Sequence, residues 1–338
     1  MPAERRSVFA LPKAHLHAHL ILSARPETMA ELADRYGVDL GDAWTCGSLG
    51  ELIQKSPIAF GLIRTPDDLA RLCREFVEDE ATQGVAYTQP MMGVGFISRQ
   101  LGLTPEEVFA IHEEAMGAAS EATGVQVGFM FGILRHESPE VAEAVARFAA
   151  ERADRGVAAL GVAGDELIPS LPSFRRAVEI AREAGLLVVP HAGEIGGPES
   201  VLEALDLLKP DRIAHGVRAA EDPDLLHRLA DDGVTCDVCP TSNVTLGICS
   251  AIEAHQIPAL LAAGVPITLN ADDQLFFGPK VAEEYALVRD AFGLTDEQLA
   301  EIARTSARAS GAPAGTVASM LGGIDAWLAA APGSFTES

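Results

Sequence analysis

The stretch Leu186–Glu194, which reads LLVVPHAGE, decides the fold, because an apolar run of strand-forming residues stops there at a histidine and a glutamate. In front of it, apolar residues recur at helical spacing at Phe174, Ala177, Val178 and Ala181. Gly185 then ends that helix, as glycine commonly does. A helix followed by a buried strand is one unit of an α/β fold with a parallel sheet.

The same strand pattern recurs along the chain. The predicted strands are residues 14–20, 84–91, 125–134, 158–163, 186–189, 212–214, 235–238 and 266–269. Helical stretches lie between them, such as Asp224–Ala230, which has Asp222 and Pro223 at its start. Eight alternating units predict a closed (β/α)8 barrel, also called a TIM barrel. Because no linker divides the chain, we expect residues 1–338 to form a single domain.

Residues 37–65 do not follow the rhythm of strands and helices. They contain Gly41, Trp44, Gly47, Pro57 and Phe60. An insertion after the first strand of a barrel lies at its C-terminal mouth, so we expect residues 37–65 to form a lid there. A packing insert with no role in binding is the alternative.

Composition excludes several classes of partner. The 338 residues include 25 Lys and Arg against 49 Asp and Glu, a net charge of −24 that repels nucleic-acid polymers and anionic membranes. No window approaches the roughly 18 apolar residues of a membrane span, and the first residues lack the pattern of a signal peptide. Five scattered cysteines do not make a disulfide framework. We therefore expect a cytoplasmic protein that binds a small molecule.

Three histidines lie in the first predicted strand, at His15, His17 and His19. Alternation with period two predicts all three side chains on one face of the strand. Three histidines in five residues are hard to explain as packing, because each ring brings two polar nitrogens that need partners. Two imidazoles at this spacing can share one metal ion, but spacing leaves open whether His15 and His17 or His17 and His19 do so.

Polar groups also follow the later strands. His191 and Glu194 follow the fifth strand, His215 the sixth, and Asp272 and Asp273 the eighth. In a (β/α)8 barrel the ends of the strands converge on one mouth, where the active sites of this fold lie. Histidines from two strands together with an aspartate make an N3O site that suits Zn²⁺ with an open position for water. The other polar groups would surround that water.

In combination, these motifs resemble the adenosine deaminase family of zinc-dependent aminohydrolases. The resemblance runs from about residue 9 to residue 330 and rests on Leu11–Leu20 (LPKAHLHAHL), Gly164–Glu166 (GDE), His191–Glu194 (HAGE), His215-Gly216, Cys239–Asn243 (CPTSN) and Leu269–Asp273 (LNADD). It implies one Zn²⁺ per chain with the ligands His17, His19, His191 and Asp272. His15 stands where the family more often has glutamate, so the resemblance leaves it out of the site.

The resemblance also implies roles for the remaining residues. Glu194 would protonate ring nitrogen N1 of a 6-aminopurine, so that a zinc-activated water attacks C6 and ammonia leaves. His215 would orient that water, and Asp273 would hold N7. The backbone N–H of Gly164 would face N3, and His19 would also border the substrate. The chain is thus expected to be a hydrolase that acts on the C–N bond of cyclic amidines.

Departures from the family pattern concern the substrate. Ile21-Leu22 stands where the family commonly has Asp-Gly, whose carboxylate reaches the ribose, and Thr88-Gln89-Pro90 replaces a Glu-x-Arg pattern. Isoleucine cannot accept a hydrogen bond from a sugar hydroxyl. The main reading is a deaminase of an adenosine-like 6-aminopurine nucleoside. The alternatives are an adenine deaminase and a 6-aminodeoxyfutalosine deaminase of menaquinone biosynthesis, and the acidic chain makes AMP the least favoured substrate.

Other readings are weaker. Binuclear barrel hydrolases that carry a carbamylated lysine need a lysine after the fourth strand, and none occurs between Lys55 and Lys209. A non-catalytic barrel would be expected to have lost Glu194 or a ligand. The pair Cys236 and Cys239 is expected to be a core feature, because cysteines three apart on a strand point to opposite faces. The remaining histidines, mostly expected at the surface, are His112, His136, His227 and His255.

Overall fold

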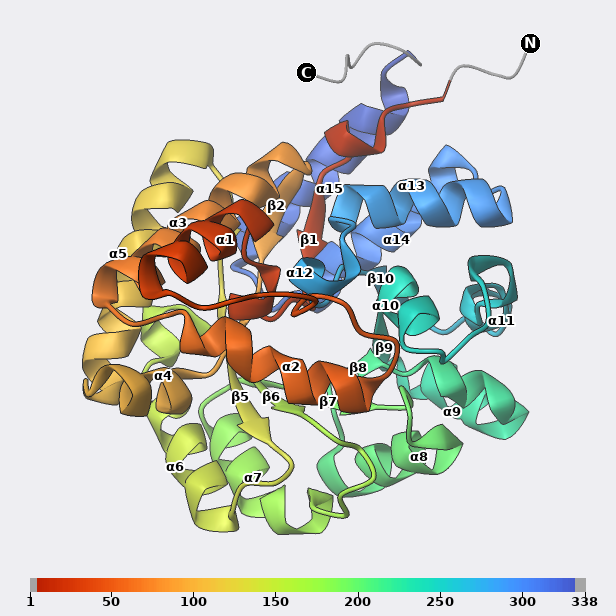
Figure 1. The fold of residues 1–338 in the computed structure, drawn as a ribbon. Coiled ribbons are helices and arrows are strands. Elements are labelled where there is room, and N and C mark those ends of the chain that lie inside the picture. Colours follow the sequence, from red (N-terminus) through yellow and green to blue (C-terminus); the bar gives the residue numbers. More distant parts are fainter. Residues whose placement is uncertain (1–4, 332–338) are drawn as a thin grey trace.

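Short parallel strands form the centre of the molecule, and helices surround them (Figure 1). The computed structural model describes residues 5–331. The strands within this range are β1 (Lys13–His15), β2 (Val85–Thr88), β3 (Met91–Met92), β4 (Gln126–Val127), β5 (Phe129–Leu134), β6 (Val157–Ala163), β7 (Leu187–Ala192), β8 (Arg212–His215), β9 (Thr235–Val238) and β10 (Ile267–Leu269). They pair in the orders β1-β2-β4 and β10-β9-β8-β7-β6-β5-β3.

These strands occupy eight positions around a barrel, because two of the positions are each split in two. β2 and β3 are interrupted at Pro90, which has no N–H to donate. β4 and β5 are interrupted at Gly128, where a Cβ atom would lie 1.8 Å from the hydroxyl of Tyr87. The eight predicted strand ranges coincide with these positions, which confirms the prediction of a (β/α)8 barrel.

The first strand is shorter than predicted, and the reason lies at the closure of the barrel. β1 ends at His15 instead of continuing to Leu20. The side-chain oxygen of Asn270 accepts the backbone N–H groups of Leu16 and His17, at 2.8 and 3.0 Å, in place of a strand partner. The N–H of Asp272 then donates to the carbonyl of His17, and this bond joins the end of the last strand to the first.

Helices lie outside the strands. Those that follow barrel strands are α3 (Pro66–Thr82), α5 (Pro105–Thr123), α6 (Pro139–Ala150), α7 (Arg175–Glu183), α8 (Gly197–Leu208), α9 (Pro223–Asp232), α11 (Ile257–Ala262) and α14 (Asp296–Ala309). The others are α1 (Pro26–Tyr36), α2 (Leu49–Gly61), α4 (Val94–Leu101), α10 (Pro240–Thr245), α12 (Gln274–Phe277), α13 (Val281–Phe292) and α15 (Ala314–Ala329). Several begin as their sequences predict: Thr65 and Thr104 each cap a helix whose first residue is proline.

The irregular segment 37–65 contains α2, which crosses in front of the strands in Figure 1. Its Trp44 packs edge-on against Phe276 of α12, with 5.6 Å between the ring centroids. α2 also contacts a short 3₁₀ turn at Ile21–Ser23, directly after the histidine motif. The insertion therefore lies against the chain segments that carry the predicted site.

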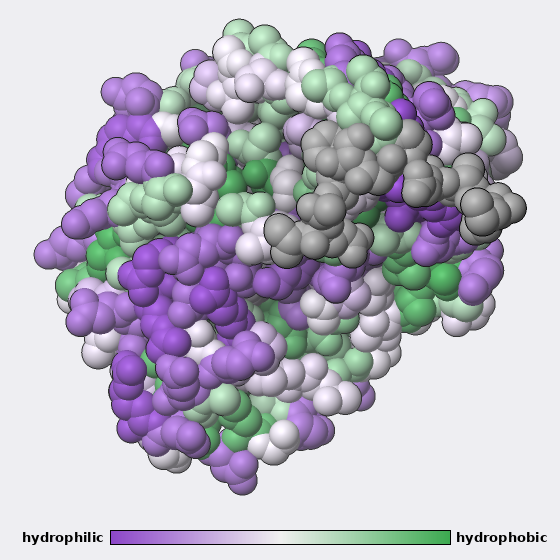
Figure 2. All heavy atoms as spheres, turned by 90° about the horizontal axis from the view of Figure 1, so that it is seen from above, coloured by the Kyte–Doolittle hydropathy of each residue, from purple (hydrophilic) through white to green (hydrophobic). Residues whose placement is uncertain are grey.

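The outer surface is largely hydrophilic on the face shown in Figure 2. On the face shown in Figure 2, hydrophilic residues form a broad continuous area and hydrophobic residues appear in smaller separate groups. None of the helices in residues 5–331 is long and apolar enough to cross a membrane.

Candidate metal centre and active site

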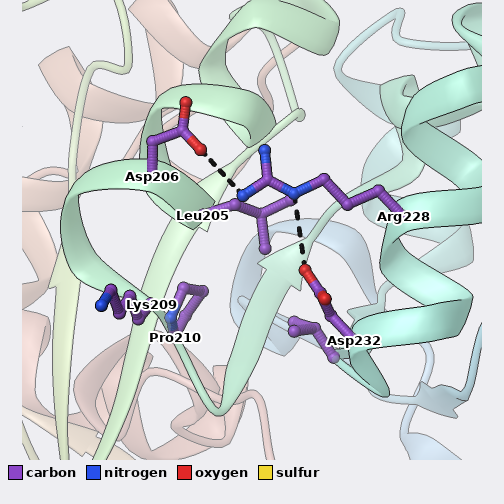
Figure 3. Close-up of a pocket in the computed structure, with 7 residues that line it drawn as sticks. Leu205, Asp206, Lys209, Pro210, Arg228 and Asp232 are labelled. Atoms are coloured by element: carbon purple, nitrogen blue, oxygen red, sulfur yellow. Dashed lines mark hydrogen bonds and ion pairs between the residues drawn. The ribbon is translucent and has the colours of Figure 1, made fainter.

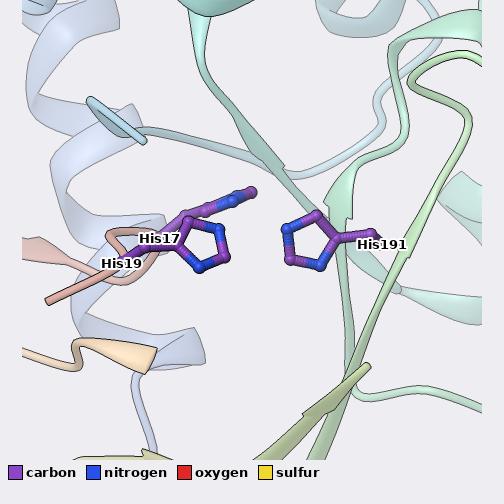
Figure 4. A group of neighbouring side chains, drawn as sticks. All are labelled: His17, His19 and His191. Atoms are coloured by element: carbon purple, nitrogen blue, oxygen red, sulfur yellow. The ribbon is translucent and has the colours of Figure 1, made fainter. Parts of the chain in front are cut away.

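Three histidines meet at the mouth of the barrel. His17 and His19 come from the extended segment after β1, and His191 comes from the end of β7 and faces them from the opposite side (Figure 4). One ring nitrogen of each lies within 4.8 Å of the others. The carboxylate of Asp272 completes the group, because its Oδ1 lies 3.4 Å from Nε2 of both His17 and His19.

This arrangement fits a divalent metal ion. Ligand atoms about 2 Å from a tetrahedral zinc ion lie about 3.3 Å from one another, close to the two 3.4 Å separations found here. Both ring nitrogens of His17 are buried and, within the part of the chain that the structure describes, have no hydrogen-bond partner. Nδ1 of His191 donates to the carbonyl of Val162 at 2.9 Å, which leaves its Nε2 lone pair free to bind a metal. The four residues named by the resemblance are therefore brought together.

His15 does not share the face of the other two histidines. Its Nδ1 lies 2.9 Å from the carboxylate of Glu80 on α3, and its Nε2 accepts the N–H of Ala271 at 3.1 Å. The expectation that all three rings share one face is wrong, because regular strand alternation stops at His15. With both nitrogens occupied, His15 is not available to a metal at the mouth.

Glu194 and His215 lie beside the histidine cluster. Glu194 is 3% exposed, and burial, followed by the charges of Asp272 and Glu166, raises the pKa of its carboxyl group well above the usual value. Nε2 of His215 lies 3.5 Å from Oε1 of Glu194. Burial, followed by the neighbouring His17, lowers the pKa of His215 to about 3. A carboxyl group with a raised pKa and an imidazole with a lowered pKa thus lie side by side.

Asp273 follows directly on Asp272 and is buried as well. Within residues 5–331, its Oδ1 has no hydrogen-bond partner. Burial, followed by the charges of Asp272 and Glu194, raises the pKa of Asp273 well above its usual value. A buried carboxyl group whose protonated form is favoured in this way is suited to form a hydrogen bond with a ligand.

Backbone strain is found at two of these positions. His215 and Asp272 have φ angles of +68° and +57°, which residues other than glycine rarely adopt. Such conformations persist where the surroundings enforce them, and they concentrate at functional sites. Gly164, at the end of β6, has a φ of +96° that favours glycine, and its N–H is where the resemblance expects a substrate contact.

Glu166 supports Glu194, a role that sequence reasoning missed. Its carboxylate accepts the N–H groups of Gly193 and Glu194 at 2.8 Å and of Ile195 at 3.0 Å, and so holds the turn after β7. Glu166 belongs to the GDE motif already singled out, so its sequence signal was present. Ser242, in the CPTSN motif, similarly donates to Oδ2 of Asp272 at 2.7 Å.

The histidines outside the motifs and the cysteine pair lie in different surroundings. His112 and His255 are buried, at 2% and 4% exposure, whereas His136 and His227 are exposed as expected. Cys239 lies close to the ring nitrogens of His17 and His215. Burial, followed by the charge of Asp272, raises the pKa of the Cys239 thiol well above its usual value, so the thiolate that a metal needs is disfavoured.

A surface pocket of about 420 Å³ lies elsewhere, near the beginnings of β8 and β9 (Figure 3). Its guanidinium group, from Arg228, lies 2.8 Å from Asp206 and 3.4 Å from Asp232. The ends of the strands carry the histidines, so this pocket is at the opposite end of the barrel from them. The charges of Arg228, Asp206 and Asp232 are paired with one another, and the pocket contributes nothing to the mouth.

Fold and site together define a class: barrel hydrolases that gather histidines and carboxylates at the C-terminal ends of their strands. The family model that matches residues 12–327 is described as adenosine deaminase, and the chain belongs to this family of aminohydrolases. The resemblance drawn from the motifs is thereby confirmed. The chain is an adenosine/adenine deaminase-type hydrolytic deaminase.

Individual relatives are also close in sequence and structure. A putative adenosine/adenine deaminase of Streptomyces virginiae is 43% identical, and the match covers 96% of this chain and 98% of that protein. The crystal structure of an adenine deaminase from Arthrobacter aurescens has a TM-score of 0.87 at 28% identity and covers 94% and 99%. An amidohydrolase from Burkholderia ambifaria, with bound Zn, has a TM-score of 0.84 at 26% identity and covers 95% and 93%.

Proposed function

We propose that this protein is an adenine deaminase that converts the free base and water into hypoxanthine and ammonia. One observation carries the choice of the base over the nucleoside: Ile21 and Leu22, where the family has a ribose-binding aspartate and a glycine, are apolar and buried at 4% and 7% exposure. The adenosine-like nucleoside was the main sequence reading, and adenine was an alternative. The adenine deaminase of similar structure favours that alternative.

The second departure supports the same choice. Gln89 stands in the segment that replaces the Glu-x-Arg pattern, and its amide is already occupied. Its Oε1 accepts from Arg212 at 2.6 Å and its Nε2 donates to the carbonyl of Ser310 at 3.1 Å. The oxygen and the nitrogen of this amide are thus both engaged inside the barrel, which disfavours a role for Gln89 in binding a sugar.

We infer that one Zn²⁺ per chain is held by His17, His19, His191 and Asp272. When bound, zinc supplies Lewis acidity that makes water a nucleophile at neutral pH. The unpartnered nitrogens of His17 and the bound zinc in the Burkholderia amidohydrolase support this assignment. Elemental analysis tests it: Asp272→Ala should lose most of its zinc, and Arg228→Ala, at the far end of the barrel, should keep wild-type content. Unchanged zinc in Asp272→Ala would remove Asp272 from the ligand set.

The protein groups can then be assigned to the two ends of the reaction. Glu194, whose pKa burial raises well above its usual value, would donate a proton to ring nitrogen N1, which makes C6 more electrophilic. His215 points its Nε2 toward the space beside Glu194 and is placed to stabilise charge on the attacking oxygen. Asp273 would donate to N7 and the Gly164 N–H would face N3. Loss of ammonia from C6 leaves the 6-oxo purine.

We also infer that residues 37–65 cover the substrate as a lid. Trp44 packs on Phe276, only three residues after Asp273. Burial, followed by the charge of Asp273, raises the pKa of the Cys46 thiol in the same insertion to about 11. Because the insertion packs against the segments that follow β1 and β10, we expect it to exclude water from the mouth during the reaction.

Ammonia release from a panel of purines tests the substrate. The panel contains adenine, adenosine, 2′-deoxyadenosine, 5′-methylthioadenosine, 6-aminodeoxyfutalosine and AMP. We expect kcat/KM for adenine to exceed that for adenosine by at least about 100-fold, the size expected when a sugar must enter without hydrogen-bond partners. A preference for any nucleoside would overturn the choice of adenine, and failure on every compound would overturn the aminopurine proposal.

A further inference from the structure

Behind His215, a line of hydrogen bonds leads away from the mouth. Asn243, on α10, donates from Nδ2 to Nδ1 of His215 at 3.2 Å. His255, just before α11, lies with its Nε2 3.2 Å from Oδ1 of the same asparagine. Nδ1 of His255 in turn accepts the backbone N–H of Ile257 at 3.1 Å. The three side chains are almost fully buried, at 1% (His215), 0% (Asn243) and 4% (His255) exposure.

The direction of these bonds is set at the end that is farthest from the mouth. The backbone N–H of Ile257 can only donate, so Nδ1 of His255 must accept. A neutral His255 therefore carries its proton on Nε2 and donates it to Oδ1 of Asn243. The amide of Asn243 is thereby oriented with its NH₂ toward His215, whose Nδ1 must accept. The proton of a neutral His215 is left on Nε2, the nitrogen that faces the site.

Burial supports this order. A water-free setting disfavours a charged imidazole, and burial lowers the pKa of His255 to about 4. If the Asn243 amide were reversed, its NH₂ would face Nε2 of His255, whose proton would then sit on Nδ1 and oppose the N–H of Ile257. Two donors that face each other in a buried place are both left without an acceptor, and each then carries an uncompensated desolvation penalty.

We propose that His255 is a positioning residue that, through Asn243, holds His215 in the tautomer with its proton on Nε2. The consequence for activity rests on the proposed deaminase function. In this tautomer the donor of His215 points at Oε1 of Glu194, 3.5 Å away, and toward Oδ2 of Asp272 at 3.9 Å. The other tautomer would present a lone pair to both carboxyl groups and could not donate to an oxygen that gains negative charge.

The test compares paired variants of the zinc-loaded protein. His255→Leu removes the donor to Asn243, whereas His255→Gln keeps a donor near the position of Nε2. Asn243→Asp replaces the NH₂ group by a second acceptor and should move the proton of His215 to Nδ1. His112→Leu is the matched control, because His112 is also buried but bonds only the carbonyl of Val108 on its own helix.

Two readouts separate positioning from general destabilisation. Long-range ¹H–¹⁵N correlation spectra of protein labelled at its histidines report which nitrogen of His215 is protonated, and a His215→Gln variant assigns the signal. Steady-state kinetics with adenine give kcat and KM separately. For His255→Leu we expect a mixed tautomer and a kcat reduced by about 10- to 100-fold, the range typical of such supporting partners, with KM little changed.

In His255→Gln we expect the wild-type kcat and a His215 protonated on Nε2. In Asn243→Asp we expect His215 to be protonated on Nδ1. In His112→Leu we expect neither kcat nor the tautomer of His215 to change. The proposal is overturned if wild-type His215 is protonated on Nδ1, or if His255→Leu keeps both the Nε2 proton and the wild-type kcat. Should His255→Leu fail to fold, an Nε2-protonated His215 in Asn243→Asp overturns it equally. A wild-type protein inactive on every purine refutes the proposed function while the spectra still decide the tautomer.

Discussion

The interior of the barrel and its mouth both contain buried polar groups, but these groups are hydrogen-bonded in the interior and partly unpartnered at the mouth. In the interior, Arg212 donates to Asp237 at 2.8 Å and to Gln89 at 2.6 Å, and Thr268 donates to the other oxygen of Asp237. At the mouth, both ring nitrogens of His17 and an oxygen of Asp273 have no partner within the described residues. Buried polar groups are normally satisfied, so a cluster of unpartnered ligand-type groups at the mouth favours a bound ligand there.

Asn270 connects the two regions. Its Nδ2 donates to Thr268 at 2.8 Å, and its Oδ1 accepts the backbone N–H groups of Leu16 and His17. The satisfied interior thus fixes the backbone of a residue whose side chain is left unsatisfied. A backbone held by a hydrogen-bonded interior, with unpartnered side-chain atoms at the mouth, allows a metal and a substrate to bind with little rearrangement. Four predictions follow from this contrast, in order of expected effect.

At the mouth, a change that keeps shape should abolish turnover and leave the fold intact. Glu194→Gln removes the acidic proton, and loss of a general acid lowers kcat by about 10²- to 10⁴-fold. Ammonia release measures the rate, and zinc content and thermal unfolding should stay at wild-type values. Glu284→Gln is the matched control: Glu284 is also buried, and burial raises its pKa to about 8, but its carboxyl group is hydrogen-bonded to Thr241. Near-full activity in Glu194→Gln would exclude it as the proton donor.

In the interior, a change should act on stability. Arg212→Met leaves Asp237 buried without its ion-pair partner, which typically costs about 3–5 kcal/mol in the free energy of unfolding. Urea unfolding followed by circular dichroism measures this loss. Arg228→Met is the control, because its partly exposed pair with Asp206 should be worth no more than about 1 kcal/mol. Equal effects of the two variants would contradict the claim that the interior network supports the fold.

His112 extends the contrast to a buried histidine outside the mouth. Burial lowers its pKa from 6.5 to about 4, so the unfolded chain binds the proton first as the pH falls. Its contribution to stability is therefore complete above pH 6.5 and is lost as the pH falls toward 4, by roughly 2–4 kcal/mol. Unfolding of wild type and His112→Met between pH 7.5 and about pH 4 should show a flatter decline in the variant. An identical pH dependence would contradict the shift, and deamination near neutral pH should be unaffected.

The smallest effect on activity is expected at the contact between the insertion, residues 37–65, and the mouth of the barrel. Trp44→Ala removes an edge-on aromatic contact with Phe276, and such contacts are worth about 0.5–1.5 kcal/mol. If residues 37–65 act as a lid, KM for adenine should rise by about 2- to 10-fold with a smaller change in the free energy of unfolding. Phe60→Leu is the control within the same insertion, because Phe60 packs on Phe96 of α4 instead. A loss of stability without any change in KM would favour a packing insert.

Much of the architecture could be predicted because most strands of the barrel can be recognised from their residue types and from the turn residues beside them. Leu186–Val189 is a short apolar run after a glycine, and it overlaps β7. Thr235–Val238 is a short segment with strand-forming residues at both ends, and it coincides with β9. The first strand could not be bounded in this way. Its alternation of histidine and apolar residues continues to Leu20, but the partner that takes the N–H groups of Leu16 and His17 is a side chain, Asn270, from the other end of the chain.

The candidate site was predictable in its residue types and only partly in its geometry. Each of His191, Glu194 and Asp272 follows an apolar run, and strand ends meet in a barrel. By contrast, His255 follows a short 3₁₀ turn with Glu253 nearby, a context in which a histidine is ordinarily exposed. Its burial and its contact with Asn243 depend on how two loops pack, which local sequence does not encode.

By itself, the sequence determined the barrel, its acidic surface and the set of chemical groups at the strand ends, because each depends on residue order and strand period. The tertiary structure decided which groups face one another. It turned His15 away to Glu80, brought Asp272 to 3.4 Å from His17 and His19, and placed His255 behind Asn243 and His215. The physical reason is that hydrogen-bond direction and metal geometry depend on distances between atoms far apart in the chain, which only the closed barrel fixes.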